Sequence, residues 1–528
     1  MKRFGKKEER PMKNQSRVTR REFMRNCAAG TAGAAVLPYV VKAANGSGTI
    51  PTGANMKLED YLNHFQVTEE HIQQVMAEAL SRGGDYCDVY FEHNISNYIG
   101  LEDKAVNRAY SNVDYGVGIR VLKGDQTGYS FTEEISLKAM KQAARTAANI
   151  ANASAQIPTA ELTPRPVPNY YPIKTAWEDV SIDKKIPFLQ TINEKVFALD
   201  PRIIKSNIWF INNTSKVLIA TSEGKLVYDY RPMGQIAVSC LAEQNGAREQ
   251  NGFNLSGRRG IDFFTPETVD RLAGEAVRRT VALFDAVKPQ AGEMEVVLAA
   301  GSSGILLHEA IGHGMEADFN RKKVSIFSDK INKPVAEKFV SIVDNGTNAH
   351  IRGSLNIDDE ANPTEETYLV ENGILKSYLH DRISAQHYKV KPTGNGRRQS
   401  FRYAPLPRMC NTYMLPGPHS KEEIIKSVKK GLYAEDFTNG EVYIGAGDFT
   451  FYVKSGYLIE NGEITKPVKD VNIIGNGPEV LQKIVMVADD LKMAEGGWTC
   501  GKNGQGVPVS QGLPTVKVSA ITVGGLNA

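Results

Sequence analysis

Residues 206–243, SNIWFINNTSKVLIATSEGKLVYDYRPMGQIAVSCLAE, decide the fold class of this chain. The segment is rich in apolar and β-branched residues, and Asn, Ser and Gly interrupt it at the intervals expected of turns. This pattern predicts four strands, at Ile208–Ile211, Val217–Thr221, Leu226–Tyr230 and Gln235–Leu241. Because the connections are short, the strands are expected to form an antiparallel meander.

Further elements extend from this meander toward both ends of the chain. Helical periodicity is present at Thr68–Arg82, Glu134–Ala153, Ile182–Leu199 and Pro266–Val287. Strands are expected at Asp85–Glu92, Asn97–Glu102, Val117–Leu122 and Thr127–Phe131, with a hairpin turn at 123–126. A later strand, Met294–Ala299, leads into a helix from Ile305 to about Met315.

Two breaks divide these elements into domains. They are the proline-rich connector Pro158–Pro172 and the segment Pro289–Gly292. We therefore expect an N-terminal α/β domain at 45–157 and a middle domain with the β-meander and a helix at 173–288. A C-terminal mixed, mainly antiparallel β domain at 289–528 would carry the inserted helix. The predicted fold class is α+β.

The positive charge of the chain is concentrated in its first residues. Residues 1–43 contain eleven Lys/Arg and three Asp/Glu, so the rest carries −5 although the whole chain carries +3. Nucleic-acid binding is not expected, because no basic stripe remains. Thr19–Arg25, with its Arg20-Arg21 pair, and the mild apolar run Cys27–Val41 resemble a twin-arginine signal peptide at 1–44. We expect export by the twin-arginine machinery and a periplasmic location.

Residues 308–313, HEAIGH, combine two imidazoles and a carboxylate in one turn. Zinc-binding helices usually space their histidines four residues apart, which places both rings on one face. His308 and His313 are five residues apart, and five steps of a regular α-helix rotate the second ring by roughly 140°. A π-helical turn, with its i→i+5 hydrogen bonds, would bring both rings to one side. We predict a π-bulge here, or a helix broken at Gly312.

A catalytic zinc usually takes three protein ligands, so a third must come from elsewhere in the chain. The candidates are Cys500, His350, His380, His387, Glu316 and Asp318. Cys500 is flanked by glycines that permit a sharp backbone course, and its thiolate is a strong soft ligand. Glu309 can serve as general base for a water molecule beside the ion. The spacing alone also fits core histidines and a buried thiol.

Four segments resemble the TldD branch of the TldD/PmbA metallopeptidase family. They are HEAIGHGMEADF at 308–319, IDDE at 357–360, GNGRR at 394–398 leading to PRMCNTYM at 407–414, and TCGK at 499–502 with GQ at 504–505 and VPV at 507–509. The resemblance runs from about Asp85 to the end. It implies a divalent ion held by His308, His313 and Cys500, with Glu309 as the base. We expect zinc, and iron is the alternative, because two imidazoles and a thiolate suit both.

The resemblance also implies a peptide substrate and a dimer. The dimer would be a homodimer or a heterodimer with a PmbA/TldE-like subunit that lacks the metal motif. Two features depart from the family pattern. Cys410 stands where threonine is expected, which we interpret as a tolerated small residue. The export leader is the larger departure, because the best-known relatives are cytoplasmic.

Arg397, Arg398 and Arg408 have two interpretations. They could bind a peptide carboxylate bidentately, or they could be structural ties between strands. An extended peptide could also add to a strand edge, for which Ser400–Tyr403 and Phe449–Lys454 are candidates.

The predicted activity is metal-dependent hydrolysis of unfolded or extended peptides. One alternative is a cysteine peptidase in which Cys500 is the nucleophile and His308 or His313 is the base. The other is a non-catalytic peptide-binding subunit whose metal is structural.

Overall fold

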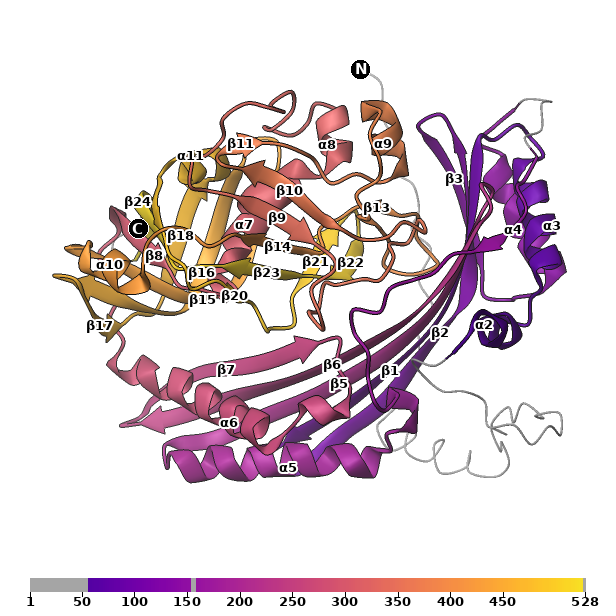
Figure 1. Cartoon of the computed structure of the whole chain (residues 1–528). Coiled ribbons are helices and arrows are strands. Elements are labelled where there is room, and N and C mark those ends of the chain that lie inside the picture. Colours follow the sequence, from indigo (N-terminus) through magenta and orange to yellow (C-terminus); the bar gives the residue numbers. More distant parts are fainter. Residues whose placement is uncertain (1–55, 153–157, 526–528) are drawn as a thin grey trace, which may run out of the picture. The chain divides into compact units, whose positions relative to one another are not determined.

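The computed structural model describes residues 56–152 and 158–525, and the predicted leader at 1–44 lies outside them. Its longest strands form a seven-stranded sheet in the order β3-β2-β1-β5-β6-β4, with β7 also paired to β6 (Figure 1). The strands are β1 (Tyr86–Glu102), β2 (Ala105–Lys123), β3 (Gln126–Thr132), β4 (Thr163–Pro164), β5 (Ile203–Thr221), β6 (Lys225–Gln244) and β7 (Ala247–Gly257). All pairings except the parallel β4–β6 pair are antiparallel. The α+β class and the antiparallel meander are confirmed.

The strands of this sheet are longer than the sequence pattern predicts. The four strands expected between 206 and 243 are two, β5 and β6, joined by the turn before Gly224, which has φ +87°. The expected turn at Asn212-Asn213 is wrong, because both residues pair with β1 on one side and β6 on the other. Pairing on both sides outweighs the turn preference of asparagine here. β1 likewise merges two expected strands.

Helices cover one face of this sheet. They are α2 (Leu58–Phe65), α3 (Glu69–Leu80), α4 (Leu137–Ala148), α5 (Ile182–Leu199) and α6 (Pro266–Val281). α2, α3 and α4 share an apolar core with one end of the sheet, and α5 and α6 share another with the opposite end. One sheet therefore contains strands of both the predicted N-terminal domain and the predicted middle domain. The boundaries of these domains stay a prediction. Among the described helices, none is long and apolar enough to cross a membrane.

The C-terminal part of the chain packs against the other face of the sheet. Tyr90 and Val217 of the sheet form an apolar cluster with Ile357 and Phe401. Buried ion pairs reinforce this contact. Arg120 of β2 lies 2.6 Å from Glu360, and both side chains are fully buried. The IDDE segment is thus part of the contact between the sheet and the C-terminal part.

Residues 292–524 form two larger sheets around a common apolar core. The first contains β8 (Gly292–Leu298), β15 (Lys430–Tyr443), β16 (Asp448–Glu460), β17 (Glu463–Pro467), β18 (Val471–Asn476), β19 (Ile484–Val487) and β24 (Val516–Gly524). Five of these strands, β15, β8, β24, β18 and β16, pair in a closed ring. The second sheet contains β9 (Ile342–Asn345), β10 (Glu366–Glu371), β11 (Ile374–Leu375), β14 (Asn411–Met414), β20 (Lys492–Met493) and β23 (Ser510–Leu513).

The metal motif lies in the connection between these two sheets. After β8 the chain forms α7 (Ile305–Leu307), η6 (His308–Gly312), η7 (His313–Met315) and α8 (Ala317–Arg321). The remaining helices are α9 (Arg382–Tyr388), α10 (Lys421–Lys426) and α11 (Gly477–Gln482). Two hairpins complete the fold, β12 (Gly396–Arg397) with β13 (Leu406–Pro407), and β21 (Thr499–Lys502) with β22 (Gln505–Pro508).

Candidate metal centre

The helix that carries the two histidines changes its winding at the motif. Residues His308–Gly312 form a π-helix, and the backbone N–H of His313 donates to the carbonyl of His308. This i→i+5 bond compensates for the five-residue spacing, so the two rings lie with centroids 5.1 Å apart. The predicted π-bulge is confirmed. Gly312 allows it, because a Cβ there would overlap Sδ of the buried Met409.

Cys500 completes a compact set of ligand atoms with the two histidines. Its Sγ lies 3.3 Å from Nε2 of His313, and the three ligand atoms all lie within 4.8 Å of one another. His308, His313 and Cys500 are buried, with exposed fractions of 1%, 5% and 3%. Nδ1 of His308 has no hydrogen-bond partner among the described residues, so hydrogen bonding does not prevent this ring from binding a metal ion. Two imidazoles and a thiolate fit a borderline cation.

The thiol and the imidazole of His313 polarise each other. Burial alone raises the pKa of Cys500, but His308 and His313 together lower it well below its usual range. Burial alone lowers the pKa of His313, but Glu316 and Cys500 raise it well above its usual range. The arrangement therefore favours the thiolate form of Cys500, which is the form that binds a metal.

Glu316 orients His313 from the opposite side of the ring. Its carboxylate lies 3.0 Å from Nδ1, which leaves Nε2 directed at Cys500. Metal-binding histidines commonly have such a carboxylate partner, which fixes the tautomer and the ring orientation. Burial alone raises the pKa of Glu316, but Lys502 and His313 lower it to about 2. Glu316 is therefore an ionised carboxylate in a fully buried position.

The hairpin that supplies Cys500 also holds Glu316 in place. Cys500 and Lys502 lie two residues apart on β21, so their side chains share a face of the strand. Nζ of Lys502 lies 3.1 Å from Glu316, 2.7 Å from Asp318 and 3.0 Å from the carbonyl of Pro407. One short hairpin thus positions the candidate ligand Cys500 and also the carboxylate of Glu316, which contacts the candidate ligand His313.

Glu309 lies at the rim of the site. Its carboxylate is 3.8 Å from Nε2 of His313, and 16% of its side chain is exposed. Burial raises its pKa, which the neighbouring His308 and His313 partly oppose. A carboxylate in this position can accept a proton from water beside the ligand set.

The other candidate ligands lie outside the set. Among residues 56–152 and 158–525, the His/Cys/Asp/Glu group whose ligand atoms converge is His308, His313 and Cys500. His350 lies near the carbonyl of Arg258, and His380 packs against Tyr378 and Tyr388. Like these two, His387 and the carboxylates of Glu316 and Asp318 are not in the group. Cys410 is a fully buried thiol, and burial raises its pKa to about 12.

The three arginines make the contacts of structural ties. Arg397 donates to the carbonyls of Met409 and Pro508, and Arg408 donates to that of Cys500. Arg398 lies 3.0 Å from Asp88 of β1. All three are at least 96% buried and already bonded. These contacts favour the structural interpretation, and a role in substrate binding stays a prediction.

Neither predicted strand edge is available in the expected form. Phe449–Lys454 lies in β16, which pairs with β15 on one side and β18 on the other over most of that stretch. Ser400–Tyr403 is a turn, not a strand. Both predictions are wrong, because β16 is paired on both sides within the closed ring and Ser400–Tyr403 forms no strand. In the second sheet, the two strands that end the order are β11 and β20.

The sequence interpretation missed the supporting roles of Glu316, Lys502 and Arg408. One signal was available, since Lys502 follows Cys500 at the two-residue interval that places both on one face of a strand. Arg408 could not be assigned from sequence, because its partner is the backbone carbonyl of a residue 92 positions away.

Two imidazoles, a buried thiolate and a nearby carboxylate define a metal-dependent hydrolytic class of site. Family models agree with this class along the chain. The PmbA/TldA metallopeptidase domain 1 matches residues 87–151, the central domain matches 176–284, and the C-terminal domain matches 291–525. The chain belongs to the TldD/PmbA metallopeptidase family, and it is a metallopeptidase.

Similar proteins cover nearly the whole described chain. The metalloprotease TldD homolog of Haemophilus influenzae is 40% identical over 91% of this chain and 99% of its own length. The zinc metalloprotease TldD homolog of Saccharolobus solfataricus is 30% identical over 85% and 98%. The crystal structure of TldE from Thermococcus kodakarensis shares the fold, with a TM-score of 0.68 at 16% identity over 86% and 100%.

Proposed function

We propose that the protein hydrolyses unfolded or extended peptides with one zinc ion held by His308, His313 and Cys500. The observation that carries this proposal is the convergence of the three buried ligand atoms within 4.8 Å across a π-helical turn. Zinc is favoured by the donor set and by the description of the Saccharolobus solfataricus relative as a zinc metalloprotease. Iron binds the same donors and is the alternative metal.

The reaction requires a proton acceptor beside the metal, and Glu309 is placed to provide it. When bound, a divalent cation supplies Lewis acidity, which polarises the scissile carbonyl and makes water more acidic. Glu309 accepts the proton of the attacking water and returns it to the leaving amine. Glu316 and Lys502 hold His313 in position during these steps.

A cavity whose lining reaches Trp498, two residues before Cys500 in the sequence, is a candidate site for an extended peptide. Its volume is about 620 Å3, and it is lined by Lys492 and Met493 of β20 and by the segment Gly496–Trp498. Because β20 ends the order of its sheet, its outer backbone groups can pair with a peptide main chain. Such main-chain pairing depends little on the side chains of the peptide, which suits a peptidase that acts on unfolded chains.

Glu309→Gln tests the assignment of the base. We expect the variant to keep its zinc while peptidase activity on fluorescently labelled unfolded casein falls by about 10²–10⁴-fold. Cys500→Ala should lose the zinc and the activity together. If Glu309→Gln stays active and metal-free wild type is active but sensitive to alkylation, the thiol is the nucleophile. If the protein is inactive alone and with its partner, a binding subunit with a structural metal is the better account.

The proposal includes export and a partner. The Arg20-Arg21 leader supports transport of the folded protein to the periplasm. Replacing both arginines by lysine should retain the protein in the cytoplasm, and unchanged export would exclude this route. The partner is a TldE-like subunit or a second copy, supported by the fold shared with TldE. The mass of the native assembly, measured by light scattering with and without such a subunit, decides between them.

A further inference from the structure

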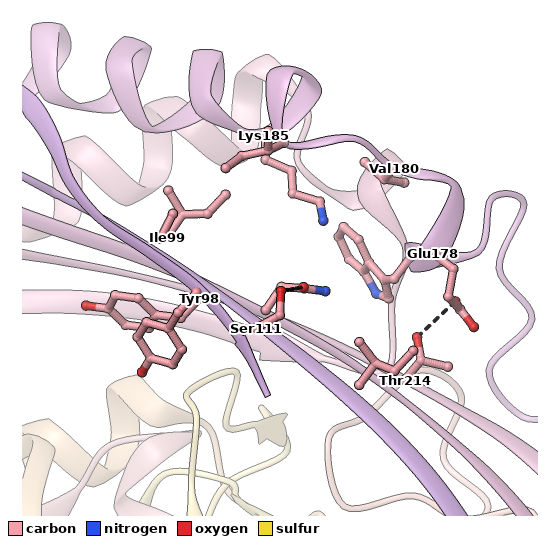
Figure 2. Close-up of a pocket in the computed structure, with 13 residues that line it drawn as sticks. Tyr98, Ile99, Ser111, Glu178, Val180, Lys185 and Thr214 are labelled. Atoms are coloured by element: carbon pink, nitrogen blue, oxygen red, sulfur yellow. Dashed lines mark hydrogen bonds between the residues drawn. The ribbon is translucent and has the colours of Figure 1, made fainter. Parts of the chain in front are cut away.

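A second cavity lies on the helix-covered face of the long sheet. Its volume is about 470 Å3, and its walls come from β1, β2, β5, the start of α5 and the short helix η2 (Trp177–Asp179) (Figure 2). Ile95, Ile99, Trp177 and Val180 make much of the lining apolar. None of its lining residues belongs to the metal centre.

A polar row crosses three strands at the sheet side of this cavity. Asn97 of β1 lies opposite Ser111 of β2 and opposite Asn212 of β5. The neighbouring row, Ile99 with Ala109 and Phe210, is apolar. Polar side chains between a sheet and its covering helix are costly unless they have partners. In this row Asn212 is buried, whereas Asn97 is partly exposed and Ser111 is exposed, so the cost falls on Asn212.

Both amide oxygens of this row already accept a hydrogen bond. Oδ1 of Asn97 accepts a hydrogen bond from Ser111 at 2.5 Å, and Oδ1 of Asn212 accepts one from Lys185 at 2.9 Å. Each amide also has an NH2 group, which can only donate. Nδ2 of Asn212 is buried and has no partner among the described residues. The buried group of this row that lacks a partner is thus a donor.

Lys185 adds a buried positive charge to these donors. Its side chain extends from α5 into the cavity in Figure 2, and the residue is 4% exposed. Its Nζ lies 5.6 Å from the ring centre of Trp177. No carboxylate of residues 56–152 and 158–525 forms an ion pair with it, and burial lowers its pKa. A buried ammonium without an anion is unfavourable, so an anionic ligand would be stabilised here.

The carboxylate in the cavity wall does not fill this need. Glu178 is engaged elsewhere, because it lies 3.1 Å from Lys216 and accepts hydrogen bonds from Tyr230 at 2.8 Å and Thr214 at 3.2 Å. Its charge is thereby balanced by Lys216. The ammonium of Lys185 is left with a neutral acceptor, Oδ1 of Asn212, and with apolar walls.

We propose that this cavity binds an organic monocarboxylate with an apolar body. The carboxylate accepts from Lys185 and from the amide of Asn97, and the apolar part contacts Ile95, Ile99 and Trp177. The ligand is either a free acid or the C-terminus of a peptide, since both present the same group. Binding involves no covalent step.

Calorimetric titration of the full mature protein tests the proposal. The probes are 3-phenylpropionate for a free acid, acetyl-alanyl-phenylalanine for a peptide terminus, and the neutral amide of each. We expect at least one acid to bind, with an affinity at least tenfold above that of its amide. Whichever acid binds more tightly identifies the source of the carboxylate.

Three variants assign the binding to this cavity. Lys185→Met keeps the apolar stem and should weaken acid binding at least tenfold, whereas Lys185→Arg keeps the charge and should retain most of it. Lys184→Met removes the same charge from an exposed neighbour on α5 and should bind as wild type does. The proposal is overturned if neither acid binds, if acid and amide bind equally, or if folded Lys185→Met binds as tightly as wild type.

Discussion

Glu316→Gln is the substitution that best distinguishes a role of Glu316 in metal binding from a role in the stability of the fold alone. Glu316 is fully buried, and it contacts Nδ1 of His313 at 3.0 Å and Lys502 at 3.1 Å. Substitutions behind a metal ligand typically weaken metal binding by about 10–100-fold. That loss corresponds to about 1.4–2.7 kcal/mol of binding free energy.

The same substitution should also lower the free energy of unfolding. Removing one partner of a buried ion pair costs about 3–5 kcal/mol. We expect about 3 kcal/mol for Glu316→Gln, because Lys502 keeps Asp318 at 2.7 Å as a second partner. The loss of metal affinity therefore has to be measured on protein that is shown to be folded.

The assay is zinc competition with a chromophoric chelator at neutral pH, combined with thermal unfolding of each variant. Asp229→Asn is the matched control, since it removes a buried carboxylate 2.8 Å from Arg231 in the long sheet. It should lose stability and keep wild-type zinc affinity. Folded Glu316→Gln protein that binds zinc as tightly as wild type would refute the orienting role of Glu316.

Three further outcomes are expected. Burial raises the pKa of Glu92 to about 7. The folded state then retains a proton that the unfolded chain releases near pH 4.5, so stability falls by up to about 3 kcal/mol between about pH 4.5 and 7. Glu92→Gln should flatten this fall in unfolding curves at pH 5, 6 and 8, and an unchanged fall would assign it to other groups. Gly312→Ala should reduce the zinc content, because the added Cβ would overlap Met409. Gly274→Ala is the control, because a Cβ there meets nothing within 4 Å, and it should keep the wild-type zinc content. Equal zinc contents in the two variants would mean that Met409 moves aside. Removing the metal with a chelator should lower the melting temperature, and an unchanged value would show that the native fold does not bind it.

The local geometry of the metal motif could be predicted from sequence because it depends on one helix. With a five-residue spacing, His308 and His313 can bind one metal ion only if the helical turn widens. The π-helix follows from that constraint. The choice of Cys500 among six candidates came from the family resemblance. Its contact with His313 joins residues 187 positions apart, a separation that helical periodicity does not address.

The long sheet shows where local patterns failed. Asn212 and Asn213 have the composition of a turn, yet neighbouring strands on both sides keep them extended. The cavity at Lys185 could not be anticipated either, because helix α5 gives no sign of which strand residues lie opposite it. Both features depend on cross-strand register, which a single sequence specifies only through its final packing.

Bound metal per chain tests the central claim most directly. It should be measured on the protein without residues 1–44, purified without chelator, for wild type, Glu309→Gln and Cys500→Ala side by side. We predict close to one zinc per chain in wild type and in Glu309→Gln, and a marked loss in Cys500→Ala. Wild type that holds no metal even after reconstitution, or Cys500→Ala that holds as much as wild type, would contradict the assignment of His308, His313 and Cys500 as the metal ligands.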